Sequence, residues 1–184
     1  MLYFAYGSNL NIPHLTEYLD THGVTQEDTE LKAEHALLHN FRLRTNYFSG
    51  SHGAGACNIE PEQAKCVEGV VMTITPAIQK ILRVKEGHPH RYHETEVEVH
   101  TALTQAPVRA LTYVVTPEYR LDVDLPVTAR YRALILAGAK NFRLSESYQQ
   151  SLRSQLRTAP LLLTVPSHNP PLKPRLMADI NLNN

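Results

Sequence analysis

The sequence has no tryptophan, only two cysteines and no net charge. Lysine plus arginine and aspartate plus glutamate both number 18 among the 184 residues. Proteins that bind nucleic acid or an anionic membrane surface usually carry an excess of positive charge on one face, because they must neutralise phosphates. The balanced charge therefore argues against nucleic acid and membrane as partners.

Long apolar runs are also lacking. One of the longest spans only residues 161–165, whereas a membrane-spanning helix needs about 20 apolar residues. The N-terminus has no basic region ahead of an apolar segment, which a secretory signal would require. The sequence thus predicts neither a spanning helix nor a signal peptide, and a cytoplasmic location is the default expectation.

The two cysteines, Cys57 and Cys66, lie nine positions apart in what the pattern indicates are two neighbouring strands. A disulfide is geometrically possible between such strands. In a reducing cytoplasm, two small buried thiols are the better interpretation. Neither cysteine has an obvious base beside it in sequence, so a role as nucleophile is not favoured.

The first half of the chain alternates strand signals with two short helices. Apolar residues at 15, 18 and 19 follow Pro13 at helical spacing, and Gly23 ends this helix. Strand periodicity covers 41–47, a glycine-rich loop follows at 50–55, and segments 56–59 and 67–74 look like a strand pair joined by a polar turn. A second helix starts at Thr75, as N-cap, with Pro76 in its first turn, and ends at Gly87.

Two more strands and two helices follow. Residues 93–100 alternate in polarity, and 108–115 are rich in β-branched side chains. Apolar residues recur at helical spacing from Tyr131 to Gly138 and again from Leu144 to Leu156. Strands early and helices late predict an α+β fold. We expect one domain over residues 1–159 and a proline-rich C-terminal tail over 160–184, which has five prolines and no core of its own.

The most informative segment is the first ten residues, MLYFAYGSNL. An apolar strand there breaks directly into Gly7, Ser8 and Asn9. Glycine can adopt positive φ and lets a ligand approach the backbone, and the N–H groups after it can point into one concavity, which suits a carboxylate or a developing oxyanion. A plain strand-ending turn would explain three such residues alone, but the whole string is longer than a chance turn.

The string YFAYGSNL resembles the N-terminal signature of the gamma-glutamyl cyclotransferase family, also known as AIG2-like. The segments EGVVMTI, ILRVKEG, ARYRALILAGAK and YQQSLRSQL are similar to further family segments, in the family's order and at similar spacing. Together they cover about residues 2–156. The resemblance implies a small, mixed, barrel-like β-sheet flanked by helices, a topology that periodicity alone does not predict.

The family resemblance also implies a reaction without cofactor or metal. The α-amine of a gamma-glutamyl amino acid or amine attacks the substrate's own γ-carbonyl, which closes 5-oxoproline and expels the amine. Effective molarities of roughly 10⁵ to 10⁸ M are available to such intramolecular reactions. The protein must move protons from the attacking to the leaving nitrogen and stabilise the tetrahedral oxyanion.

Glu86 matches the glutamate with which the family moves these protons, and we expect it to be the general acid/base. It also lies at the C-terminal end of a predicted helix, where the helix dipole disfavours a carboxylate, so burial there would raise its pKa. Without the resemblance, an exposed helix-end glutamate would be the ordinary interpretation. Family members often carry Asp three residues earlier, and here Arg83 occupies that position, which puts the tuning of Glu86 in question.

The same resemblance assigns substrate binding to the N-terminal loop and one tyrosine. Backbone N–H groups of the loop would hold the carboxylate and the γ-carbonyl, its flanks would shape the pocket, and Tyr131 would hydrogen-bond the substrate or serve as a core residue with its hydroxyl at the rim. The expected substrate-binding residues are Tyr6, Gly7, Ser8, Asn9, Leu10 and Tyr131.

Two other polar clusters do not require a catalytic or metal-binding role. His88, His90 and His93 could converge on a metal, but no nearby cysteine or acid completes a ligand pattern, so we expect them to line the entrance beside Glu86. Asp122 and Asp124 are expected to be solvated loop acids.

Two alternatives to the cyclotransferase remain open at the level of sequence. One is a non-catalytic module that binds a small acid, and the other is a metal site at the histidines. The leaving amine and the oligomeric state stay undetermined, although a different residue after YGS in glutathione-specific relatives disfavours intact glutathione.

Overall fold

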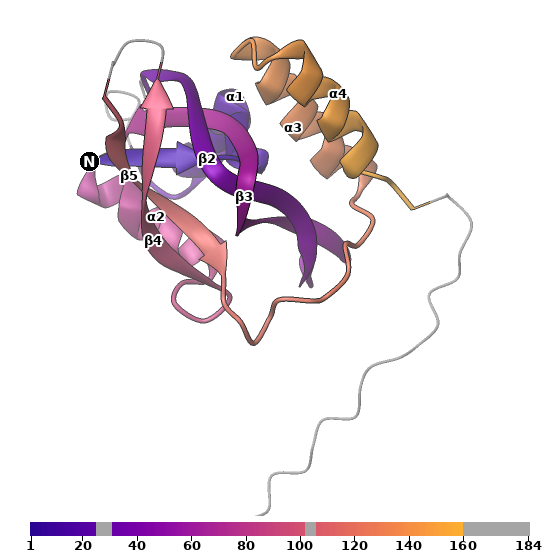
Figure 1. Cartoon of the computed structure of the whole chain (residues 1–184). Helices are drawn as coiled ribbons and strands as arrows, with labels where there is room; N and C mark the ends of the chain where they lie inside the picture. The colour runs from indigo at the N-terminus through magenta and orange to yellow at the C-terminus, as the bar shows by residue number, and fades with distance from the viewer. Residues whose placement is uncertain (25–30, 102–105, 160–184) are drawn as a thin grey trace, which may run out of the picture.

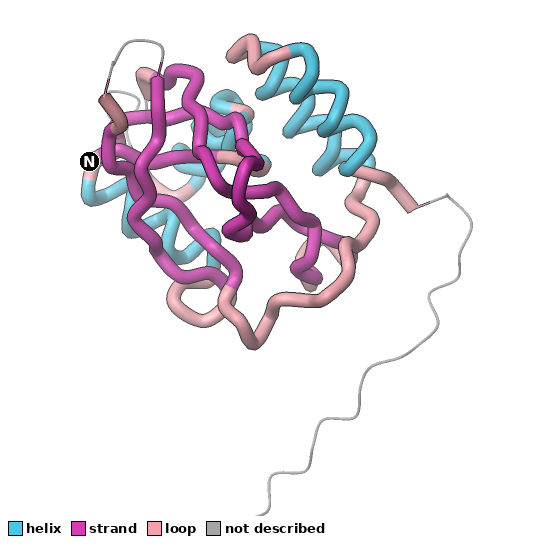
Figure 2. The backbone as a smooth tube through the Cα atoms, viewed as in Figure 1, coloured by secondary structure: helices cyan, strands magenta, loops and turns pink. Residues whose placement is uncertain are grey.

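Five strands close into a barrel in the part of the chain that the computed structural model describes, residues 1–24, 31–101 and 106–159. The strands are β1 (Leu2–Ala5), β2 (Ala33–Ser49), β3 (Ala54–Thr73), β4 (Tyr92–Thr101) and β5 (Val108–Val115). The helices are the 3-10 turn η1 (Ser8–Leu10), α1 (Ile12–Thr21), α2 (Pro76–Glu86), α3 (Ala129–Asn141) and α4 (Glu146–Gln155). Figures 1 and 2 show α3 and α4 packed together on one side of the barrel.

The barrel is mixed, as the family resemblance implies. Its strand order is β1-β3-β2-β4-β5, and β5 returns to β1. Neighbouring strands run antiparallel except β1 and β5, which are parallel where Tyr3 faces Leu111. This confirms the α+β prediction. β1 is short and lies between β3 and β5. Where the chain leaves the barrel at Tyr6, it is therefore surrounded by residues that are distant in sequence.

The prediction of two separate strands at 56–59 and 67–74 is wrong, because both belong to the single strand β3. Both halves pair with β2, which is long enough to run past them. The polar residues between them form a bulge in which Asn40 of β2 faces residues 62–65 of β3. Asn40 and Ala64 have φ of 61° and 63°, and the Ala64 N–H donates to Asn40 Oδ1 at 3.2 Å. A bulge of this kind absorbs extra residues without ending the pairing.

The two cysteines consequently lie along one strand rather than across two. Cys57 is buried, Cys66 is half-buried, and both are free thiols. Their separation along β3 places the predicted pair of thiols at opposite sides of the bulge. The interpretation as free thiols stands, whereas their placement on neighbouring strands is corrected.

The boundaries of α2 match the prediction. The Thr75 hydroxyl accepts a hydrogen bond from the Ile78 N–H at 3.3 Å, and Pro76 occupies the first turn, where its missing N–H costs nothing. At the other end Gly87 has φ 67° and ψ 34°, the left-handed conformation that terminates helices. These caps fix Glu86 as the last residue of α2.

Helix α3 packs closely against the N-terminal loop. Tyr131, Ile135 and Gly138 are buried, as the helical spacing predicts, while Leu134 is half-buried. A Cβ at Gly138 would lie 2.6 Å from the Leu10 backbone, so glycine allows α3 and η1 to approach. The predicted stripe on α4 also holds, with Leu144, Leu152 and Leu156 buried and Tyr148 half-buried.

Two predictions concern the limits of the domain. The division at residue 159 remains a prediction, and the proline-rich tail over 160–184 lies outside the described residues.

No helix in the described ranges has the length and apolar character to cross a membrane.

Candidate active site

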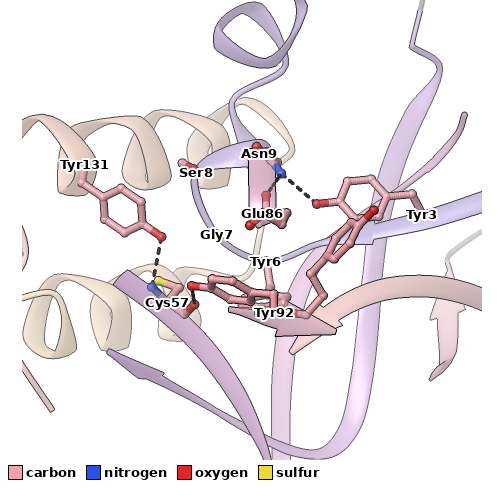
Figure 3. A pocket seen from close by; sticks show the side chains of 10 residues that line it. Tyr3, Tyr6, Gly7, Ser8, Asn9, Cys57, Glu86, Tyr92 and Tyr131 are labelled. Carbon is pink, nitrogen blue, oxygen red and sulfur yellow. Dashed lines mark hydrogen bonds between the residues drawn. The ribbon is translucent and has the colours of Figure 1, made fainter. Parts of the chain in front are cut away.

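A small cavity opens where β1 ends and η1 begins. Its volume is about 40 Å³, enough for a few water molecules, since one water needs about 10–15 Å³ measured this way. Five tyrosines, one carboxyl group and one thiol contribute to its wall (Figure 3). The lining residues are Tyr3, Tyr6, Gly7, Ser8, Asn9, Cys57, Glu86, Tyr92, Tyr113 and Tyr131.

Glu86 is the only acidic residue in this lining. The side chain is partly buried, and its Oε1 accepts a hydrogen bond from Asn9 Nδ2 at 3.0 Å. Burial raises the pKa of the Glu86 carboxyl above its ordinary value, while the charge of Lys85 and the hydrogen bond from Asn9 oppose the shift. A carboxylate with a raised pKa is a stronger base, so the cavity contains a group suited to accept a proton.

Asn9 connects two groups of the cavity wall, the Glu86 carboxyl and the Tyr3 hydroxyl. It is 4% exposed, and its Nδ2 donates both to Glu86 Oε1 and to the Tyr3 hydroxyl at 2.8 Å. Figure 3 shows the amide between these two partners. One amide thus links β1, the N-terminal loop and the end of α2, which holds the Glu86 carboxyl in one position.

The contribution of Gly7 is the space left by its missing side chain, and not a positive φ. Its φ is −108°, so the expectation that it needs positive φ is wrong. An added Cβ would lie 3.3 Å from the Tyr131 hydroxyl and 3.5 Å from Cys57 Cβ. The loop therefore passes so close to α3 and β3 that a side chain at this position would enter the cavity wall.

Tyr131 of α3 contributes one side of the cavity wall (Figure 3). Its hydroxyl accepts a hydrogen bond from the Cys57 N–H at 3.0 Å, and the Tyr92 hydroxyl donates to the Cys57 carbonyl at 2.8 Å. Burial raises the pKa of the Cys57 thiol to about 12. Cys57 is therefore a neutral thiol at physiological pH, which makes it a poor nucleophile.

Of the expected substrate-binding residues, Leu10 does not line the cavity. Its side chain is fully buried and packs below Gly138, because the 3-10 turn directs it into the core between η1 and α3. Tyr6, Gly7, Ser8, Asn9 and Tyr131 do line it together with Glu86. The Tyr6 hydroxyl donates to the Tyr113 carbonyl at 2.5 Å and so holds β5 beside the loop.

Four lining residues were not expected from the sequence: Tyr3, Cys57, Tyr92 and Tyr113. They lie on β1, β3, β4 and β5, where strand periodicity marks them only as core candidates. Burial raises the pKa of the Tyr3, Tyr92 and Tyr113 hydroxyls well above the ordinary value, so they remain protonated. The one available signal was composition, since nine tyrosines against four phenylalanines and no tryptophan is unusual for a plain apolar core.

Arg83 does not contact Glu86 in this arrangement. Its guanidinium binds Glu94 of β4 through two hydrogen bonds, at 2.8 and 2.6 Å. Glu94 also accepts from Tyr113, which lines the cavity, at 2.9 Å and from Gln79 at 3.1 Å. Arg83 thus fastens α2 to the barrel wall, one turn before Glu86.

Replacing Glu94 with Gln should make the stability of the fold depend less steeply on pH in acid. The Arg83 hydrogen bonds lower the pKa of Glu94 to about 2, so its ionised form stabilises the fold above pH ~4.5 and that contribution disappears as pH falls toward about 2. We expect the wild-type melting temperature to fall more steeply over this range than that of Glu94→Gln, measured by circular dichroism. Glu96→Gln, at a side chain 65% exposed on the same strand, is the control and should follow the wild type. Parallel slopes for Glu94→Gln and wild type would contradict the assignment.

The three histidines do not line the wall of the Glu86 cavity, and their place at its entrance stays a prediction. Gly87 reverses the chain, and the following N–H groups bond back to α2, with His88 N–H donating to the Arg83 carbonyl at 2.9 Å. His88 and His90 instead line a separate surface hollow. Within the described ranges, no three histidine, cysteine or acidic side chains are placed to hold a metal ion.

The acids near Pro126 have structural partners. Asp124 Oδ1 accepts from Arg44 Nε and from the Thr45 N–H, each at 2.8 Å. The Asp122 carbonyl accepts from Arg44 Nη2 at 3.2 Å. These contacts hold the segment after β5 against β2, and neither acid lines the Glu86 cavity.

Comparisons with known proteins agree with this fold. Residues 66–152 match the model of the AIG2-like family. A solved structure of a gamma-glutamyl cyclotransferase superposes with a TM-score of 0.72 at 23% identity, over 90% of this chain and 93% of that one. An uncharacterized human protein gives a TM-score of 0.72 at 25% identity with the same coverages of 90% and 93%. A yeast gamma-glutamyl cyclotransferase specific to glutathione gives 0.56 at 15%, over 85% and 95%. No curated protein matches the sequence.

The barrel and its flanking helices define a protein with the gamma-glutamyl cyclotransferase fold. The match of residues 66–152 to the AIG2-like family model confirms the resemblance drawn from the sequence motifs.

Proposed function

We propose that the protein is a cyclotransferase that releases 5-oxoproline from a gamma-glutamyl amino acid or amine, without a cofactor. The observation that carries the proposal is the Glu86 carboxyl in a small cavity beside the Gly7–Ser8–Asn9 loop, held by Asn9 Nδ2 at 3.0 Å. The fold shared with a gamma-glutamyl cyclotransferase supports the same reaction class.

In this reaction the substrate's α-nitrogen forms a bond to the carbon of its γ-carbonyl group, and the bond from that carbonyl carbon to the leaving nitrogen breaks. The α-ammonium gives up two protons in total. The leaving nitrogen gains one proton as it departs and a second on reaching water. Glu86 accepts a proton from the attacking nitrogen and returns one to the leaving nitrogen, and its raised pKa suits both steps.

The oxyanion that forms on the γ-carbonyl oxygen needs hydrogen-bond donors in the cavity wall. The N–H groups at the start of η1 have no partner within the turn, since the first N–H groups of a helix lack one, and Ser8 and Asn9 line the cavity. We assign them to the γ-carbonyl oxygen or the α-carboxylate. Such preorganised donors are worth about 10² to 10³ in rate at comparable sites.

The buried tyrosines give the cavity its selectivity for a slender, polar ligand. Their hydroxyls stay neutral because burial raises their pKa, so they offer hydrogen bonds without adding charge. The cavity is also too narrow for a bulky group. In the proposed complex the glutamyl portion is folded so that its nitrogen meets the carbonyl, which is the source of intramolecular rate enhancement.

The proposal is tested by measuring 5-oxoproline release from a panel of gamma-glutamyl amino acids and amines with purified full-length protein. We expect release from at least one compound, with stoichiometric appearance of the free amine. Glutamate as product in place of 5-oxoproline would indicate hydrolysis by water and would contradict intramolecular attack.

Activity should survive exhaustive chelation. The proposed nucleophile is an amine within the substrate, so no Lewis acid is needed to generate it. We expect equal 5-oxoproline release before and after dialysis against a strong chelator. The triple variant of His88, His90 and His93 to Ala should behave likewise, because these side chains do not line the cavity. Loss of activity on chelation, restored by one divalent metal, would overturn this expectation.

A further inference from the structure

The hydroxyl protons of the cavity tyrosines differ in where they go. The Tyr6 hydroxyl donates to the Tyr113 carbonyl at 2.5 Å, and the Tyr113 hydroxyl donates to Glu94 at 2.9 Å. The Tyr92 hydroxyl donates to the Cys57 carbonyl at 2.8 Å. A hydroxyl group has one proton, so these three tyrosines can offer a ligand only the lone pairs of their oxygens.

Tyr131 and Tyr3 differ from the other three because their hydroxyl oxygens accept a hydrogen bond. Tyr131 accepts from the Cys57 N–H at 3.0 Å, and it also hydrogen-bonds the thiol of the same residue. The Tyr3 hydroxyl accepts from Asn9 Nδ2 at 2.8 Å. No hydrogen bond between described residues uses the proton of Tyr3. Tyr3 therefore has a donor available for a ligand.

This donor lies close to the group that we assign to proton transfer. Tyr3 is 4% exposed and lines the same cavity as Glu86. Asn9 Nδ2 donates to the Tyr3 hydroxyl at 2.8 Å and to Glu86 Oε1 at 3.0 Å, and Figure 3 shows both side chains beside this nitrogen. Two oxygens that share one neighbour can contact two atoms of the same small group. Attack on a carbonyl requires such a pair, a base near the nucleophile and a donor near the carbonyl oxygen.

The Tyr3 hydroxyl keeps its proton at neutral pH. Burial raises its pKa, and the negative charge of Glu86 raises it further, while the hydrogen bond from Asn9 opposes the shift. The cavity therefore holds a neutral donor at this position. A hydrogen bond from such a donor strengthens when its acceptor becomes charged, as a carbonyl oxygen does when it turns into an oxyanion.

We propose that Tyr3 is a further catalytic residue, whose hydroxyl donates a hydrogen bond to the γ-carbonyl oxygen of the substrate and to the oxyanion that forms there. This inference rests on the proposed function. The proton stays on Tyr3 throughout, and Glu86 carries out both proton transfers. The N–H groups of the Gly7–Ser8–Asn9 loop then share the oxyanion with Tyr3 or hold the α-carboxylate.

Tyr3→Phe removes the hydroxyl and keeps the ring. The Tyr3 ring packs edge to face on the ring of Tyr113 with centroids 5.9 Å apart, and phenylalanine preserves this contact. The matched control is Tyr148→Phe, which removes another buried hydroxyl oxygen. Tyr148 lies on α4 and does not line the cavity. Thermal melting shows whether each variant is folded.

Tyr3→Phe should lower kcat for 5-oxoproline release by about 10²-fold, the lower end of what a single oxyanion donor supplies. KM should change by at most a few-fold, because most of the interaction develops with the oxyanion. The substrate is the compound of the gamma-glutamyl panel that releases 5-oxoproline fastest. Tyr148→Phe should match the wild type in both constants.

Two further measurements separate contact with the substrate from mere support of Asn9. If Tyr3 acted only by holding Asn9, and through it Glu86, its loss would shift the acid limb of kcat/KM to another pKa. We expect the limb to stay in place. The second measurement is the ¹³C resonance of a labelled γ-carbonyl bound to the slow variant Glu86→Gln. A hydrogen bond to the carbonyl moves this resonance downfield, and adding Tyr3→Phe should remove the shift.

The outcomes distinguish this inference from the proposed function. Unchanged kcat in folded Tyr3→Phe, a displaced acid limb, or a ¹³C resonance that does not respond to Tyr3 overturns the inference, while release of 5-oxoproline leaves the proposed function standing. If no compound of the panel releases 5-oxoproline, the proposed function fails, and the ¹³C measurement is made with labelled gamma-glutamyl-alanine and the wild type. A downfield shift that is lost in Tyr3→Phe would still support the hydrogen bond. No binding, or an unchanged shift, overturns it.

Discussion

Glu86→Gln should lower turnover by a factor on the order of 10² to 10⁴ and leave the fold intact, because general acid/base catalysis supplies about that much. Glutamine has the same shape and can still accept the hydrogen bond from Asn9 Nδ2 that the Glu86 carboxylate accepts at 3.0 Å. The change therefore removes the proton carrier and keeps the geometry. The measurement is kcat for 5-oxoproline release at saturating substrate.

The melting temperature of Glu86→Gln shows whether Glu86 contributes to the stability of the fold or only to catalysis. Burial raises the pKa of the Glu86 carboxyl in the folded protein, so its ionised form is held at a cost above that pKa. At pH 8 the neutral glutamine should give an equal or higher melting temperature than wild type. A residue retained for stability would show the opposite.

The pH dependence gives a second signature. As a base Glu86 must be ionised, so kcat/KM should rise with pH through a pKa above 4.5, and this acid limb should disappear in Glu86→Gln. Glu98→Gln, at an exposed carboxylate on β4, is the matched control and should keep both turnover and profile. Unchanged turnover in folded Glu86→Gln, with active wild type, would remove Glu86 from the mechanism.

Gly7→Val should reduce activity by on the order of 10² or more, because small displacements at a reacting centre have effects of that size. An added Cβ already lies 3.3 Å from the Tyr131 hydroxyl, and the two methyl groups of valine would extend into the cavity or push the loop away from Cys57. The measurement is kcat/KM for 5-oxoproline release, with the fold checked by thermal melting.

Two milder variants calibrate the effect. Gly7→Ala adds the Cβ alone and should fall between wild type and Gly7→Val. Ser8→Ala should change activity by only a few-fold if backbone N–H groups carry the binding, because it keeps the backbone. A larger loss for Ser8→Ala than for Gly7→Val, in folded protein, would move recognition from the backbone to the Ser8 hydroxyl.

Much of the site was predictable where short-range rules apply. The caps at Thr75 and Gly87 depend on a few neighbouring residues, and they place Glu86 at the end of α2 as expected. The N-terminal string marks the loop that lines the cavity. In contrast, strand signals alone divided β3 in two, because a polar stretch in a bulge and a polar turn look alike in sequence.

The sequence by itself determined the ends of α2, the family motifs and the acid that we assign to proton transfer, because each depends on residues close together in the chain. Tertiary structure decided which groups meet. Asn9 and Glu86 are 77 positions apart, and Cys57 and Tyr131 are 74 apart, yet both pairs share hydrogen bonds at one cavity. Closure of the barrel brings β1 beside β3 and β5, which gathers Tyr3, Tyr6, Tyr92 and Tyr113 there, and α3 adds Tyr131. No local pattern carries this information, since it depends on how distant strands pair and how α3 packs on the loop.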